Sequence, residues 1–171
     1  MQHSTTYIVG FSVVVCVVCA LFVASAEVSL RPLKELNARL DKQKNILSVA
    51  GLMQPGEDLD AEEIRVLFEN SIQPRMIDLS TGEEDISIDP SSFDQRAAAR
   101  DPARSRRAPP NPSKVLRVPN HALIYEVVEN DEIISVIIPI EGYGLWSVLY
   151  GYLALAPDMR TILGITYYDQ K

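Results

Sequence analysis

Residues 121–140 read HALIYEVVENDEIISVIIPI and decide the fold of the second half of the chain. Val, Ile and aromatic residues dominate 121–128 and 133–140, and a polar run at 129–132 separates them, as in two strands joined by a turn. Residues 145–156 and 161–168 have the same texture, with a turn at Pro157 and Asp158 between them. Consecutive strands with short turns predict an antiparallel meander in an α+β fold.

Two helices and a short strand are predicted upstream of this sheet. The segment 30–51 (LRPLKELNARLDKQKNILSVAG) keeps leucines on one face, with Pro32 at its start and Gly51 as its stop. A second helix opens with a capping box at Asp60 and ends before Pro74, because proline breaks helices. Residues 75–79 (RMIDL) follow as a strand.

The N-terminal segment is a predicted membrane span. Residues 7–26 (YIVGFSVVVCVVCALFVASA) carry no charge, and all 16 Lys and Arg and all 23 Asp and Glu lie at or after Glu27. Twenty residues suffice to cross the hydrocarbon core, whereas a signal peptide has a basic flank and a shorter apolar run. A secreted protein cleaved after Ala26 is a weaker alternative. The basic residues at 31–44 favour a cytoplasmic C-terminal domain by the positive-inside rule.

Residues 96–118 carry seven of the 16 basic residues and four prolines, which predicts a loop without regular structure. The cluster Arg104, Arg106 and Arg107 can contact anionic lipid or an acidic partner, although a solvated loop is the simpler interpretation. The chain then divides as follows: a membrane anchor at 1–29, a helical and mixed part at 30–95, the loop at 96–118, and a β-rich part at 119–171.

Few residues of the chain suggest a catalytic, metal-binding or ligand-binding role. The chain has two histidines and no phosphate-loop or zinc pattern, so we predict no catalytic or metal-binding residue, and Cys16 and Cys19 lack further ligands. The net charge of −7 argues against nucleic acid as a partner. The unusual string is Gly142-Tyr143-Gly144-Leu145-Trp146: its glycines permit close approach by a flat ligand, beside an apolar wall. A glycine turn followed by core aromatics is the alternative.

Three strings resemble the FMN-binding C subunit of the bacterial sodium-translocating NADH:quinone oxidoreductase. They are LRPLKELNARLDKQKNILSVAGL at 30–52, FDQRAAARDP at 93–102 and IPIEGYGLWSVLYGYLAL at 138–155. The resemblance implies one transmembrane helix, an FMN-binding domain, other reductase subunits and membrane lipid as partners, and the bacterial inner membrane with a periplasmic domain. It also implies an electron relay through covalent FMN, with Gly142, Gly144, Leu145 and Trp146 as cofactor neighbours.

The attachment motif of the family has no counterpart here. The family attaches FMN to a threonine in a Ser-Gly-Ala-Thr motif, which does not occur in this chain. We therefore expect an FMN-binding domain truncated at its C-terminus, inactive alone and aggregation-prone at an edge formed by Ile162, Leu163 and Ile165. The alternative function is a cofactor-free, membrane-anchored assembly protein.

Overall fold

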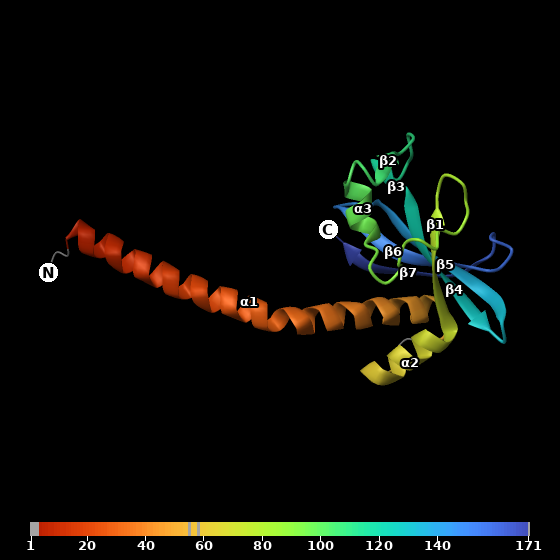
Figure 1. Ribbon diagram of the computed structural model, residues 1–171, viewed down its shortest axis with the longest axis horizontal. Coiled ribbons are helices and arrows are strands. Elements are labelled where there is room, and N and C mark those ends of the chain that lie inside the picture. Colours follow the sequence, from red (N-terminus) through yellow and green to blue (C-terminus); the bar gives the residue numbers. More distant parts are fainter. Residues whose placement is uncertain (1–3, 55, 58, 171) are drawn as a thin grey trace. The chain divides into compact units, whose positions relative to one another are not determined.

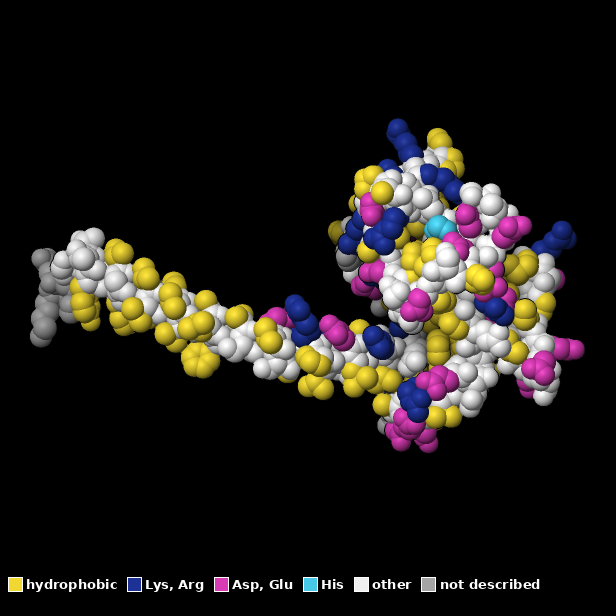
Figure 2. Space-filling view, in the orientation of Figure 1, with side chains coloured by type: hydrophobic (Ala, Val, Ile, Leu, Met, Phe, Trp, Pro, Cys, Tyr) yellow, Lys and Arg dark blue, Asp and Glu magenta, His cyan; other side chains and the backbone are white. Residues whose placement is uncertain are grey.

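The computed structural model describes residues 4–54, 56–57 and 59–170, in two compact units divided between residues 41 and 42. The first unit is helix α1 (Thr5–Val49) up to Asp41. Figure 2 shows hydrophobic side chains along the N-terminal half of this helix, before its first charged side chains. By length and composition α1 can cross a membrane, and its most apolar window is not buried in the protein. The predicted span at 7–26 lies within it.

Helix α1 is continuous through Pro32, so the prediction of a separate helix starting there is wrong. Proline has no N–H to donate to the carbonyl of Val28 and crowds that carbonyl, which weakens a helix. Strong helix formers flank the proline on both sides: Leu30, Arg31, Leu33 and Lys34. Their helix propensity compensates for the missing hydrogen bond, so the helix continues.

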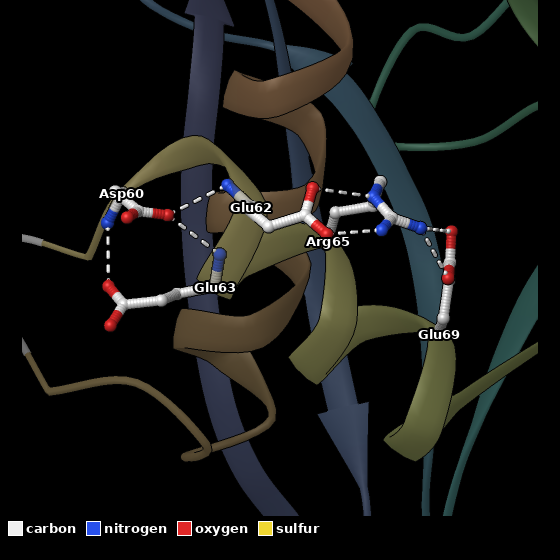
Figure 3. A network of polar contacts seen from close by, with 5 residues as sticks. All are labelled: Asp60, Glu62, Glu63, Arg65 and Glu69. Atoms are coloured by element: carbon white, nitrogen blue, oxygen red, sulfur yellow. Dashed lines mark hydrogen bonds and ion pairs between the residues drawn. The ribbon is translucent and has the colours of Figure 1, made fainter.

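Helix α2 (Ala61–Ser71) begins at the predicted capping box. The Asp60 carboxylate accepts hydrogen bonds from the backbone N–H groups of Glu62 and Glu63, each at 2.8 Å, and the Glu63 carboxylate accepts one from the Asp60 N–H (Figure 3). Arg65 pairs with Glu62 and Glu69 on the exposed face of the same helix. The first turn is therefore stabilised by local side-chain bonds.

Strand β1 (Ile72–Asp78) follows α2 directly and starts earlier than predicted. It contains Pro74, which lies opposite Tyr125 of the neighbouring strand. Proline is tolerated here because β1 is an edge strand of the described sheet, and an edge strand can carry a residue without an N–H on its outer side.

The sheet has five strands in the order β1-β4-β5-β6-β7, and every neighbouring pair is antiparallel (Figure 1). The last four are β4 (His121–Glu129), β5 (Glu132–Tyr143), β6 (Val148–Leu155) and β7 (Ile162–Gln170). These strands follow each other in sequence and in space, so the predicted α+β fold with an antiparallel meander is confirmed. Asn130 and Asp131 both have positive φ, as the tight turn between β4 and β5 requires.

The core of the second unit lies on one face of this sheet. Alternate residues of β4, β5 and β6 point to that face, as period-two strands require. The end of α1 lies against it, because a Cβ added at Gly164 in β7 would come within 2.8 Å of the Val49 carbonyl oxygen. The main buried apolar residues are Ile46, Leu47, Ile64, Ile72, Met76, Leu123, Tyr125, Val127, Ile137, Tyr152 and Ala154.

Residues 96–118 contain regular structure, so the prediction of a loop there is wrong. They include most of helix α3 (Gln95–Arg100), strand β2 (Ser105–Arg107) and the start of strand β3 (Arg117–Pro119). β2 and β3 form an antiparallel two-stranded ribbon. The prolines lie between these elements rather than inside them, apart from Pro119 at the end of β3, so the prolines do not interrupt the backbone pairing.

Candidate functional site

The second unit contains a pocket of about 310 Å³ between α3, the segment 113–117 and the neighbouring ends of β5 and β6. It draws together parts of the chain that are distant in sequence. We call it the basic pocket; its lining residues are Arg96, Ala99, Arg100, Ser113, Lys114, Val115, Leu116, Arg117, Glu141, Gly142, Tyr143, Val148 and Tyr150.

Helix α3 forms one wall and is fixed by its N-cap and by Arg96. The N-cap residue Asp94 accepts a hydrogen bond from the Ala97 N–H at 3.0 Å. The Arg96 guanidinium lies over the Tyr150 ring, 3.6 Å from its centroid, and donates a 2.6 Å hydrogen bond to Asp169. Because residues four apart share a helix face, the position of Arg96 also directs Arg100 to the pocket.

The opposite rim is the segment 113–117, which side-chain hydrogen bonds hold in place. The Asn111 amide accepts from the Val115 N–H at 3.0 Å and donates to the Val115 carbonyl at 2.9 Å. The Tyr143 N–H donates to the Ser113 carbonyl at 2.9 Å and joins the rim to the end of β5. Arg117 donates to the hydroxyl and the carbonyl of Ser105, at 2.8 and 2.7 Å. The rim is therefore preorganised.

The side chains that line the pocket carry a net positive charge. Four cationic side chains line it, against one carboxylate, Glu141. Arg96 is paired with Asp169, whereas Arg100, Lys114 and Arg117 form no salt bridge within the described part of the chain. Burial raises the pKa of Glu141, and the charges of Arg96 and Arg100 oppose that rise. A protonated Glu141 would leave the positive charge of the pocket uncompensated.

The four predicted ligand neighbours have different surroundings. Gly142 lines the basic pocket, where a Cβ would lie 3.4 Å from the Ser113 side chain. Gly144 closes the turn after β5, because its N–H donates to the Ser147 carbonyl at 2.8 Å. Leu145 and Trp146 lie in the same turn and are 88% and 82% exposed. Three of the four are thus outside the pocket, on the turn that leaves it.

The sequence pattern did not distinguish the cationic residues of the pocket from their neighbours. Of the predicted basic cluster, Arg104 pairs with Asp101, and Arg106 donates to the Leu79 carbonyl. The high density of basic residues across 96–118 indicated a positively charged region. The sequence pattern did not indicate which of these residues lie near β5 and β6. Among the described residues, no cluster of three or more His, Cys, Asp or Glu side chains is placed to hold a metal ion, and Cys16 and Cys19 are free thiols.

No protein-family model matches the chain. Curated relatives do match over nearly its whole length. The chain is 38% identical to the C subunit of the Na(+)-translocating NADH-quinone reductase of Pseudomonas aeruginosa over 170 residues, which is 98% of this chain and 64% of that protein. It is 40% identical to the corresponding protein of Vibrio campbellii, over 94% of this chain and 62% of that protein.

The fold has a solved counterpart as well. The crystal structure of Shewanella oneidensis NqrC superposes with a TM-score of 0.69 and 32% sequence identity, covering 78% of this chain and 61% of that one. The chain spans about three fifths of the length of the curated relatives it matches. These relatives are, by name, subunits of an enzyme complex. Sequence and fold together make this chain a relative of the C subunits of the Na(+)-translocating NADH-quinone reductases, as its sequence motifs indicated.

Proposed function

We propose that the chain acts as a subunit of a sodium-translocating NADH:quinone reductase, where it relays electrons through an FMN that the full-length family member carries covalently. The observation that carries this proposal is 38–40% identity over nearly the whole chain to proteins named as subunits of such reductases. The helix α1, which is long and apolar enough to anchor a protein in the membrane, agrees with it.

The residues of the basic pocket fit FMN in chemistry. FMN combines a phosphate with a flat aromatic ring, and the pocket combines cations with an apolar wall that includes Val115, Val148 and Tyr150. When bound, FMN supplies the capacity to accept and pass on electrons, and the protein supplies position and electrostatic tuning. Glu141 holds a proton at the pocket edge more readily than an exposed carboxylate, since burial raises its pKa.

We also propose that the second unit faces the periplasm, with the other reductase subunits and membrane lipid as neighbours of α1. The resemblance to the family supports this orientation, and the basic residues at 31–44 oppose it. Protease treatment of intact spheroplasts tests it: a periplasmic second unit is digested from outside, whereas a cytoplasmic one is protected.

The experiment that tests the function is affinity purification of the chain from its native membranes, followed by in-gel flavin fluorescence and intact mass. We expect a fluorescent band that co-purifies with sodium-dependent NADH:quinone reductase activity. A chain that purifies without any other reductase protein would overturn the proposal.

The alternative function is a cofactor-free, membrane-anchored assembly protein, with the long apolar helix α1 as its anchor. A non-fluorescent chain that still co-purifies with the reductase subunits would favour this role over electron transfer.

A further inference from the structure

We propose that the β2–β3 ribbon binds anionic phospholipid headgroups at the surface of the bilayer. The contact lies at the ribbon end, which we define as residues 106–116, from β2 through the connecting loop to the residue before β3. Arg106 and Arg107 bind the headgroups, and Leu116 is the apolar contact with the lipid. This surface belongs to the second unit and is separate from the membrane span in α1, so the inference does not rest on the proposed function.

The ribbon end lies in the most positively charged part of the chain. Residues 102–125 contain five Lys or Arg residues and no Asp or Glu, although the whole chain has a net charge of −7. Figure 2 shows Lys and Arg side chains over this part of the second unit, beside hydrophobic side chains. A basic surface on an acidic protein is complementary to an anionic partner.

Two arginines of the ribbon end have donors available for a ligand. The Arg107 side chain makes no hydrogen bond or ion pair within the part of the chain that the structure describes. It lies directly opposite Arg117, and like charges in that position repel each other, although Arg117 is itself held by Ser105. Arg106 donates from one nitrogen to the Leu79 carbonyl at 3.1 Å. Both guanidinium groups can therefore donate to the oxygens of a phosphodiester.

An exposed apolar side chain accompanies these cations. Leu116 is 81% exposed, although it also borders the basic pocket. The Ala108 N–H donates to the Leu116 carbonyl at 3.0 Å, so the pairing of the two strands continues to this residue. Because strand side chains alternate between faces, Leu116 shares a face of the ribbon with Arg106. A bilayer satisfies both side chains, since cations bind its headgroups and apolar groups enter the acyl boundary.

The connecting loop is held in one conformation before any ligand binds. The Asn111 side chain accepts a hydrogen bond from the Val115 N–H at 3.0 Å. It also donates to the carbonyls of Pro109 and Val115, at 2.8 and 2.9 Å. The ribbon end therefore loses little conformational freedom on binding.

The chain itself keeps a bilayer within reach of the second unit. Helix α1 is long and apolar enough to cross a membrane, and the predicted span ends at Ala26, 16 residues before the second unit begins at Lys42. Sixteen helical residues extend over about 24 Å. Such a short tether gives the second unit a high effective concentration at the bilayer surface, so weak headgroup contacts suffice.

The test reconstitutes the full chain into nanodiscs whose acyl chains are brominated and quench Trp fluorescence. Trp146→Phe removes the single Trp of the sequence, and Leu116→Trp places a reporter at the ribbon end. We expect quenching in nanodiscs of phosphatidylcholine with phosphatidylglycerol, which is anionic, and none in phosphatidylcholine alone. Raising the salt from 0.1 to 1 M should remove more than about half of the quenching, because the screening length falls from about 10 to about 3 Å.

The chain offers a matched control for the charge and one for the reporter. Arg107→Gln should weaken the quenching by at least about half, whereas Arg160→Gln, which removes one cation from the turn between β6 and β7, should not. Ile86→Trp places the reporter at an apolar residue that is 90% exposed on another loop, and should stay unquenched. Circular dichroism melts establish that each variant keeps its fold.

Three results would overturn the inference. They are an unquenched Leu116→Trp reporter in anionic nanodiscs, equal quenching with and without phosphatidylglycerol, and equal quenching of the Ile86→Trp reporter. A photo-crosslinking side chain at position 116, activated in native membranes, distinguishes lipid from an acidic protein. A lipid-sized increase in the intact mass supports the bilayer contact, and a protein-sized adduct in place of a lipid adduct refutes it.

Discussion

The Arg96 guanidinium lies 3.6 Å from the centroid of the Tyr150 ring and donates a 2.6 Å hydrogen bond to Asp169. These contacts join α3 to β6 and β7, across more than fifty residues of sequence. The Arg96 side chain also lies 5.2 Å from the Tyr168 ring centroid, and the Tyr168 ring stacks on Tyr152. Arg96 therefore links α3, one wall of the basic pocket, to strands β6 and β7.

Replacing this link should loosen the pocket wall. We expect Arg96→Met to lower the free energy of unfolding by about 1–2 kcal/mol, because the stacked charge and its hydrogen bond are both lost. Urea unfolding followed by circular dichroism measures the change. Arg104→Met removes a more exposed ion pair with Asp101 and should cost less than about 0.5 kcal/mol. Equal losses in the two variants would contradict a special role for Arg96.

The capping box at Asp60 should carry more of the stability of α2 than the salt bridges beside it. Asp60→Ala leaves the N–H groups of Glu62 and Glu63 without their acceptor, and we expect a loss of about 1 kcal/mol. Arg65→Ala removes two exposed pairs on the same helix and should cost less, because solvent screens them. Thermal melts of both variants show which substitution destabilises the protein more. A larger loss of stability in Arg65→Ala than in Asp60→Ala would contradict the prediction.

Glu141 should make stability depend on pH. The folded chain holds the Glu141 proton more tightly than the unfolded chain, because burial raises the pKa above 4.5. Stability is therefore lost as the pH rises from 4.5 through the higher pKa of the folded state. Glu141→Gln removes this loss and should melt at a higher temperature than the wild type at pH 7, with no difference below pH 4.5. A difference of the same size at both pH values would point to packing instead.

Gly151 in β6 should tolerate no side chain. A Cβ there would lie 2.2 Å from the Thr166 carbonyl oxygen of β7, a backbone atom that cannot move without breaking the strand pair. We expect Gly151→Ala to lower the free energy of unfolding by about 3 kcal/mol or more. Gly142→Ala is the matched control on β5, since its Cβ would meet Ser113 at an ordinary 3.4 Å. An unchanged melting temperature in Gly151→Ala would show that β7 can shift away.

The outer edge of β7 should promote self-association of residues 27–171 expressed alone. β7 is an edge strand of the five-stranded sheet that the described residues form, and Ile162, Leu163 and Ile165 on it are all more than half exposed. Ile165→Lys should raise the monomer fraction in size-exclusion chromatography with light scattering, because a charge on an edge strand opposes pairing. Ile86→Lys changes an equally apolar residue that is 90% exposed on a loop, and should have little effect. A monomeric wild-type domain would refute the prediction.

The elements that rest on local rules could be predicted from the sequence. The uncharged run at 7–26 defines an apolar helix by composition, and the Asp60 capping box starts α2 through bonds within four residues. The four strands of the meander follow from runs of β-branched residues with turns between them. Pro32 predicts a helix start, yet α1 runs through it, because strong helix formers on both sides outweigh one missing hydrogen bond.

The basic pocket was decided by the tertiary structure. Arg100, Lys114 and Arg117 belong to a segment whose proline content predicts a loop, and only the ribbon and α3 direct them toward Glu141 and Tyr150. The glycine-aromatic string points to Gly142, yet the neighbours of Gly142 in the pocket come from elsewhere in the chain. Local sequence specifies dihedral preferences and burial patterns, whereas a site made of distant segments exists only once the strands and helices have packed.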